Sequence, residues 1–327
     1  MSTRAVRTAY ATRPTAPARG AGRRILGAVA IAATVPYLAL KTAWLAGSRI
    51  GIPDGSVLLE PGPFFTAANA VTMVMDASVV LLVLVLTRPW GIRVPAWLPA
   101  VPVFVATGLL TPIVIAFPGQ LLIRALGFGA DPAVVAAREP FLDPWVFNVV
   151  YGGFMVQGLA LAGLFVPYAR ERWRRRWQGV TGVRLPSSTG VVAAAAAAAG
   201  LAVAAVYAYW AFGGTAGLGT EQAAAHSAET GVVAVVHMTC ALAAGAGAML
   251  LARGRGLRAR WPLALAWVGS SAALCWGTWV LLASLGPQLD GGEGPSSAAL
   301  LAYASQMITG SLAAVVVSRF LISRREG

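Results

Sequence analysis

The chain has 327 residues, of which 57% are hydrophobic and only 11% are charged. A soluble domain carries about 25% charged residues, so this composition excludes an ordinary soluble protein. The net charge of +13 is also no sign of nucleic-acid binding, because basic and acidic residues alternate from one connection to the next instead of forming one basic surface.

Apolar segments recur along the whole chain, and each is long enough to cross a hydrocarbon core of ~30 Å. Arginines gather in every second connection, acidic residues gather in the others, and tryptophans mark the ends of the segments. These signals predict an all-α polytopic membrane protein with both termini in the cytoplasm. The predicted transmembrane helices are residues 25–47, 67–87, 97–117, 146–168, 189–212, 231–252, 263–286 and 297–319.

The segment before the first span is rich in Ala, Arg, Thr and Pro and has no apolar periodicity. Residues 1–23 are therefore predicted to be a disordered basic tail. Arg23 and Arg24 precede an apolar run, as in an export signal, but this run is too long for a signal-peptide core and contains Lys41. We expect an uncleaved first span.

Two sequence matches indicate an internal repeat. Trp44 and Trp210 each end a span, and each is followed by glycines at the same two spacings. The pattern Tyr-x3-Met-x2-Gly begins at Tyr151 in the fourth span and at Tyr303 in the eighth. Because four spans separate the copies, the two repeats have the same orientation in the membrane. The predicted parts are the tail 1–23, the first four-helix repeat 24–168, a cytoplasmic linker 169–188, the second repeat 189–320 and a short cytoplasmic tail 321–327.

The linker contains the most basic run of the chain, from Arg170 to Arg176. One interpretation is a binding patch for anionic lipid head groups. The alternative is an ordinary positive-inside loop, in which Trp173 and Trp177 anchor a short interfacial helix.

Two charged residues lie inside predicted spans and are the main candidates for function. Lys41 lies about 12 Å from the outer end of the first span, and Asp76 lies about 14 Å deep in the second. A single aspartate at such depth costs about 3 kcal/mol on insertion scales. Three interpretations stay open: a structural ion pair, the polar lining of a substrate or proton path, and a lysine that extends to the head groups independently of a neutral Asp76.

Aromatic and polar residues around Lys41 extend this candidate site. Tyr37, Lys41 and Trp44 have helical spacing and project from one face of the first span. Asn148 and Tyr151 share a face of the fourth span in the same way. The hypothesis is a polar and aromatic pocket in the outer part of the first repeat. The alternative is an interfacial aromatic belt with hydrogen bonds between helices.

His237 and Cys240 are the candidates for membrane-embedded chemistry, together with Asp76. The chain has only two histidines and two cysteines, which argues against haem ligation, a metal site or a disulfide scaffold, so no cofactor is predicted. His226, Glu221 and Glu229 form a small outer cluster that fits no firm metal template, so a solvated loop is expected there. No phosphate-binding loop, zinc-protease or serine-hydrolase motif is present.

The segment VYAYWAFGGTAGL, with Tyr209 and Trp210 before a Gly-Gly pair, resembles the end of the first helix in small four-span membrane proteins of high-GC Gram-positive bacteria, a family of unknown function. The segment LVLVLTRPWGIRVPAWLPAVP, with Arg88, Trp90 and Pro95, is similar to the junction between its second and third helices. Lys41 departs from the motif in the first copy. The resemblance implies a tandem of two such units and membrane residence, and it brings no activity.

The sequence therefore favours a non-enzymatic integral membrane protein that is transporter-like or a scaffold, with a polar site in the outer half of the first repeat. One alternative is an enzyme acting on a lipid or a quinone. The other is a regulatory or assembly subunit of a membrane complex, which would contact a membrane-protein partner through the outer loop at residues 118–145.

Overall fold

The computed structural model describes residues 18–59, 62–130, 141–173, 179–182, 185–254, 256–289 and 295–324. Eight of the described helices are long and apolar enough to cross a membrane, which confirms the prediction of an all-α polytopic membrane protein. They are α1 (Ala18–Leu45), α2 (Pro63–Thr87), α3 (Trp97–Ala125), α5 (Pro144–Arg172), α7 (Ser187–Ala211), α9 (Ala228–Arg253), α10 (Arg260–Leu289) and α11 (Ser297–Ser323). Short helices in the described parts of the connections are η1 (Val57–Leu59), η2 (Pro89–Ile92) and α8 (Thr220–Ala224).

Several helices are longer than the hydropathy pattern predicts. α1 begins at Ala18, so the predicted disorder is wrong for residues 18–23, while residues 1–17 lie outside the described part. α3 continues to Ala125, into the predicted outer loop, and α5 continues to Arg172, into the predicted linker. The length of an apolar segment reflects the thickness of the hydrocarbon core. A helix can continue beyond that segment into the interfacial region, because its backbone hydrogen bonds do not depend on apolar side chains.

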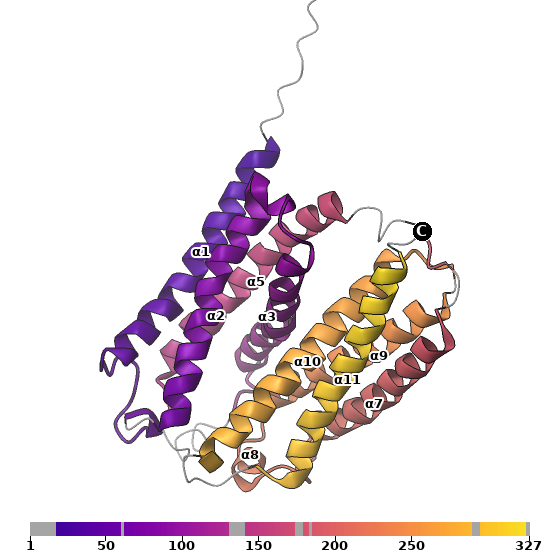
Figure 1. The fold of residues 1–327 in the computed structure, drawn as a ribbon. Coiled ribbons are helices and arrows are strands. Elements are labelled where there is room, and N and C mark those ends of the chain that lie inside the picture. Colours follow the sequence, from indigo (N-terminus) through magenta and orange to yellow (C-terminus); the bar gives the residue numbers. More distant parts are fainter. Residues whose placement is uncertain are drawn as a thin grey trace, which may run out of the picture.

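The helices form two groups in the membrane (Figure 1). The first half consists of α1, α2, α3 and α5, and the second half consists of α7, α9, α10 and α11. In the second half α7 packs on α9, α9 on α10, α10 on α11 and α11 on α7, which closes a four-helix ring. In the first half α1 packs on α2 and α5, and α5 packs on α3, whereas the backbones of α2 and α3 approach each other at few places. Side chains of α2 and Val103 of α3 still belong to one hydrophobic core. The first half is therefore the same kind of ring, open at one seam.

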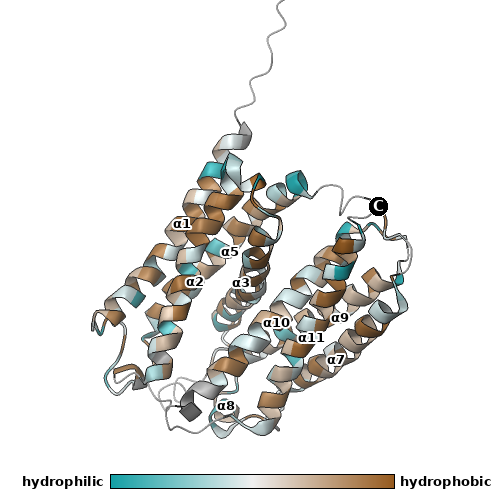
Figure 2. Cartoon of the chain, viewed as in Figure 1, coloured by the Kyte–Doolittle hydropathy of each residue, from teal (hydrophilic) through white to brown (hydrophobic). Residues whose placement is uncertain are grey.

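Small residues explain why one ring closes and the other does not. A Cβ atom on Gly247 of α9 would lie 2.4 Å from the backbone nitrogen of Ala266 on α10, and one on Gly269 would lie 2.3 Å from that of Ala244. Such close backbone approach is how helices gain packing energy in lipid. α2 has no glycine and ends in the bulky run VVLLVLVL, so it offers no position for such a close approach of backbones. Figure 2 shows that hydrophobic residues nevertheless cover most of both halves.

The turns that end α1 and α7 are built alike. The indole Nε1 of Trp44 donates to the carbonyl of Ile50 at 2.8 Å, and that of Trp210 donates to the carbonyl of Ala216 at 3.1 Å. Left-handed glycines occupy the same positions in both turns, at residues 47 and 51 and at residues 213 and 217. The two turns therefore have the same local geometry where their sequences match. The repeat of the whole four-helix unit stays a prediction.

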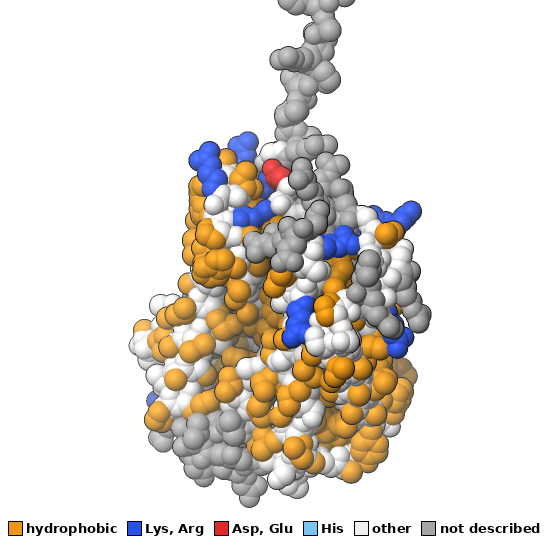
Figure 3. Space-filling view, turned by 45° about the vertical axis from the view of Figure 1, so that its right-hand side comes forward, with side chains coloured by type: hydrophobic (Ala, Val, Ile, Leu, Met, Phe, Trp, Pro, Cys, Tyr) orange, Lys and Arg blue, Asp and Glu red, His pale blue; other side chains and the backbone are white. Residues whose placement is uncertain are grey.

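An arginine holds the connection between α2 and α3 against α5. Arg172 donates to the hydroxyl of Tyr168 at 2.6 Å, to the carbonyl of Gly91 at 2.7 Å and to the carbonyl of Val94. In the run predicted to bind anionic lipid, Arg172 thus bonds to protein, Arg170 is exposed, and residues 174–178 lie outside the described part. Figure 3 shows basic side chains gathered at the end of the bundle where α1 begins.

Candidate functional site

A cavity of about 1070 Å³ lies in the first half, at the seam where α2 stands apart from α3. Residues of α1, α2, α3, α5 and α10 line it, together with the segments that follow α1 and precede α5. Most of the lining side chains are aliphatic or aromatic. Pockets for small molecules measure about 300–1,000 Å³, so this space is large enough for a molecule with a long hydrocarbon chain.

Lys41 is almost wholly buried at this cavity, with 3% of its surface exposed. Its Nζ donates to Asn69 Oδ1 at 2.8 Å and to Thr72 Oγ1, and it lies 4.7 Å from the centre of the Tyr37 ring. Asn69, Thr72 and Asp76 follow one another at i, i+3 and i+7, so α2 presents all three on one face. The lysine is thus held by neutral acceptors of α2 and by an aromatic face of its own helix.

Asp76 lines the same cavity without a direct bond to Lys41. Its side chain is 7% exposed, and among the described residues no donor reaches its Oδ2 and no ion pair joins it to Lys41. The two charged residues predicted to lie close together on neighbouring helices thus line one cavity. The direct ion pair is absent, because Lys41 is oriented toward Asn69 and Thr72, nearer the outer end of α2.

Gln157 is a site residue that the sequence interpretation missed. It lies on α5, lines the cavity, is 2% exposed, and its Oε1 has no donor among the described residues. A glutamine within an apolar span is itself a signal of a polar interior, because such a side chain is costly in lipid. The cavity therefore contains two buried acceptors without a partner, one on α2 and one on α5.

The other predicted pocket residues divide into two sets. Tyr37, Trp44 and Tyr151 line the cavity, and the ring of Tyr37 meets that of Phe154 edge-on, with centroids 5.0 Å apart. Asn148 is exposed and does not line it, so its helical spacing with Tyr151 does not bring it into the site. The part of α5 that lines the cavity instead extends from Tyr151 to Gln157, deeper in the predicted span.

His237 and Cys240 lie outside this cavity, on α9 in the second half. The Nδ1 of His237 is 3.3 Å from Gln306 Nε2, and its ring stacks on Tyr207 with centroids 5.2 Å apart. Trp276 touches the His237 ring and itself lines the cavity. The predicted set for chemistry is thus not brought together with Asp76, because its members lie on helices of different halves.

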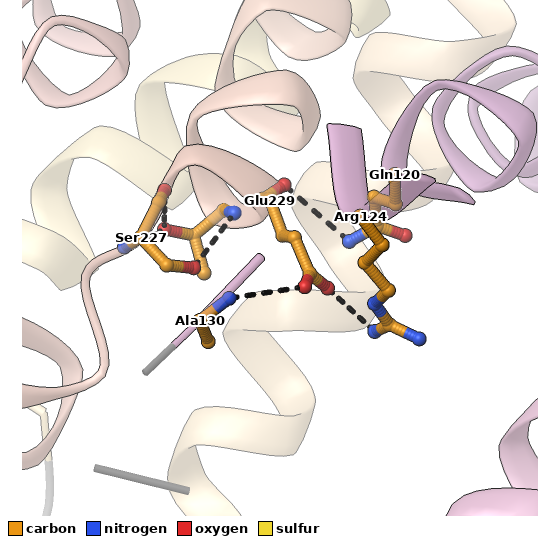
Figure 4. Close-up of polar contacts among 6 residues, drawn as sticks. Gln120, Arg124, Ala130, Ser227 and Glu229 are labelled. Carbon is orange, nitrogen blue, oxygen red and sulfur yellow. Dashed lines mark hydrogen bonds and ion pairs between the residues drawn. The ribbon is translucent and has the colours of Figure 1, made fainter. Parts of the chain in front are cut away.

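An ion pair joins the two halves at the predicted outer face (Figure 4). Arg124 at the end of α3 donates to Glu229 Oε2 at 2.5 Å, and the backbone nitrogen of Ala130 donates to Oε1 at 3.3 Å. Gln120 donates to the backbone carbonyl of Glu229 at 3.4 Å. Glu229 lies in the first turn of α9, where the helix dipole favours an anion. Glu229 of the predicted cluster is thus part of a tether, in which Glu221 and His226 take no part. The described residues hold no group of three or more His, Cys, Asp or Glu side chains that could bind a metal.

Replacing Arg124 by glutamine is expected to lower the free energy of unfolding by about 1 kcal/mol, because the half-exposed guanidinium is screened while Glu229 stays buried. Thermal unfolding in detergent at low ionic strength measures the effect, which shrinks as salt is added. Arg170→Gln, at an exposed arginine of α5, is the matched control. Equal unfolding temperatures for the two variants would contradict a stabilising tether.

The arrangement suits binding of an amphipathic molecule. The apolar walls accept a hydrocarbon chain, and the buried group of Lys41, Asp76 and Gln157 offers polar contacts at one place. Comparisons of the chain with known protein families, with characterised proteins and with solved structures gave no match.

Proposed function

We propose that this integral membrane protein binds a small membrane-soluble molecule in the cavity of its first half and moves it between the bilayer and the outer face. The observation that carries the proposal is the pair of buried acceptors, Asp76 and Gln157, in an otherwise apolar cavity. Each unpaired polar group costs about 1–3 kcal/mol, and a ligand that donates to them removes that cost.

The extent of the lining supports passage between bilayer and surface. It reaches from Arg49, in the turn predicted to lie outside, to Leu82 on α2 and Val101 on α3, both nearer the cytoplasmic end. The proposed sideways route from lipid runs between α2 and α3, whose backbones approach each other at few places. A transporter-like role accounts for a polar cavity of this extent, whereas a scaffold does not need one.

The enzyme alternative has less support, because His237 and Cys240 lie outside the cavity that contains Asp76. We further infer that the halves are tandem copies of one four-helix unit in a bacterial cell membrane, with both termini in the cytoplasm. The matching turns at Trp44 and Trp210 support this inference. In this account the second half kept the closed packing and the first half opened to form a binding site.

Filling the cavity is expected to remove the bound molecule. Ala68→Trp places an indole in the lining from α2, whereas Val74→Trp adds the same group on the same helix at a position that is 66% exposed and outside the lining. Native mass spectrometry of protein released from membranes measures the retained small molecule. Wild type and Val74→Trp should keep it, and Ala68→Trp should lose about nine-tenths of it, a cost of roughly 1.4 kcal/mol.

The molecule identified by its mass is then followed across proteoliposomes that contain each variant. Transport by wild type and Val74→Trp but not by Ala68→Trp supports the proposal. Equal retention by the two tryptophan variants would rule out the cavity as the binding site. Retention without movement across the bilayer would leave a scaffold and refute the transport role.

A further inference from the structure

We propose that the ligand of the first-half cavity is a neutral amphiphile whose polar end donates hydrogen bonds through hydroxyl groups. The inference rests on the proposed function, because it names the class of molecule that the same cavity takes. It follows from the kinds of atom left unpaired at the site, from the charge already present there and from the shape of the remaining space.

The unpaired atoms are both acceptors. Asp76 Oδ2 and Gln157 Oε1 are buried at the cavity, and neither receives a hydrogen bond from the described residues. A ligand that satisfies them has to donate. An ester, ether or ketone oxygen has no hydrogen to donate, so both acceptors would stay without a hydrogen bond. A molecule that only accepts hydrogen bonds therefore gains no binding energy from these two groups.

The charge at the site favours a neutral donor over a cation or an anion. Lys41 and Asp76 formally balance each other at the cavity, where both are buried. An ammonium group would leave the site with a net positive charge inside hydrocarbon, and a phosphate would leave it negative, each at a large cost in desolvation. The Nζ of Lys41 already donates hydrogen bonds to Asn69 and Thr72, so it does not need an anionic ligand as a partner.

The remaining lining fits a hydrocarbon chain. Leu109 and Ile113 of α3, Phe147 of α5, and Trp279 of α10 belong to it, and the cavity of about 1070 Å³ exceeds what a small polar solute would fill. Long-chain alcohols, isoprenoid alcohols and neutral glycerol lipids share this chemistry of a hydroxyl end and an apolar tail. Asp76 and Gln157 would accept hydrogen bonds from the hydroxyl end, and the apolar lining of the cavity would surround the hydrocarbon tail.

The test compares three probes with the same chain: ω-bromododecanol, its methyl ether and ω-bromododecylammonium. Bromine quenches tryptophan fluorescence on contact, and Trp44, Trp276 and Trp279 line the cavity. Titration of the full chain in lipid nanodiscs gives a Kd for each probe from the saturable part of the quenching. The alcohol is expected to bind about 10-fold more tightly than the ether, as the loss of one hydrogen bond to a charged group predicts. The ammonium probe is expected to bind more weakly than the alcohol.

The variants Gln157→Leu and Asp76→Asn assign the preference to the two acceptors. Gln157→Leu keeps the volume but removes the acceptor, and Asp76→Asn keeps an oxygen but removes the charge. Both should bring the Kd values of alcohol and ether closer together, whereas Gln222→Leu, at an exposed glutamine of α8, should leave their ratio unchanged.

The outcomes separate the two proposals. Equal Kd values for alcohol and ether in wild type overturn the hydroxyl inference, and tightest binding of the ammonium probe overturns the neutrality argument. In both cases saturable quenching that Ala68→Trp removes still supports binding in the cavity. Absence of saturable quenching by all three probes, with no effect of Ala68→Trp on native mass spectra, refutes the proposed function itself.

Discussion

Replacing Gly310 by alanine is expected to lower the free energy of unfolding by about 3 kcal/mol, the largest loss among the substitutions considered. A Cβ atom at Gly310 of α11 would lie 2.2 Å from the backbone nitrogen of Leu274 on α10. Gly277 of α10 faces α11 in return, with its Cβ position 2.5 Å from the backbone nitrogen of Met307. Backbone atoms cannot change rotamer to make room for the new methyl group, as a side chain could. The two helices therefore have to move apart where they contact each other.

Gly152→Ala on α5 is the matched control for Gly310→Ala, because a Cβ at Gly152 meets nothing within 4 Å. Alanine there should leave stability unchanged or raise it by up to about 1 kcal/mol, since it favours a helix more than glycine does. Thermal unfolding of both variants in one detergent measures the difference. If Gly310→Ala unfolds at the temperature of Gly152→Ala, close backbone packing does not hold the second half together.

The two halves differ in where they place their buried polar residues. The second half buries its polar residues against one another: the hydroxyl of Tyr207 donates to Gln306 Oε1 at 2.5 Å inside the closed ring. When Trp44 is aligned with Trp210, Lys41 takes the place of Tyr207. In the open first half that position faces a cavity, so its polar group contributes to a binding site instead of a packed core.

Much of the architecture could be predicted from the sequence. The eight spans follow from apolar length, which the cost of exposing polar backbone in lipid imposes on every membrane helix. The depths of Lys41 and Asp76 also follow, because the helical rise fixes how far each residue lies from the end of its span. Both residues do line one cavity. Asn69 and Thr72 could have been added from their spacing with Asp76 on α2.

The contacts between distant helices could not be predicted in this way. Arg124 and Glu229 lie more than 100 residues apart, and helical periodicity gives the face of each helix without naming its neighbour. The enzyme alternative combines His237 with Asp76 because both are polar residues within spans, although His237 belongs to the other ring. The wider spacing of α2 and α3 coincides with the absence of glycine from α2, and this absence becomes informative only by comparison with the glycine contacts between α9 and α10.

Replacing Lys41 by methionine is expected to lower the free energy of unfolding by about 2 kcal/mol. The change keeps most of the side-chain volume but removes the donor to Asn69 and Thr72, and it leaves Asp76 as an uncompensated buried charge. Thermal unfolding in lipid nanodiscs measures the loss. Thr72→Val, which removes one neutral partner of the lysine, should cost only about 0.6 kcal/mol, as is typical of a single polar contact between membrane helices.

The double variant Lys41→Met/Asp76→Asn separates charge balance from hydrogen bonding. Asp76→Asn removes the carboxylate charge, so adding it to Lys41→Met should recover part of the lost stability, while the bonds to Asn69 and Thr72 stay broken. A double variant that is no more stable than Lys41→Met would mean that the two charges do not balance each other. The preference of the cavity for a neutral ligand would then lose its electrostatic basis, and the hydroxyl and ammonium probes should bind with similar affinity.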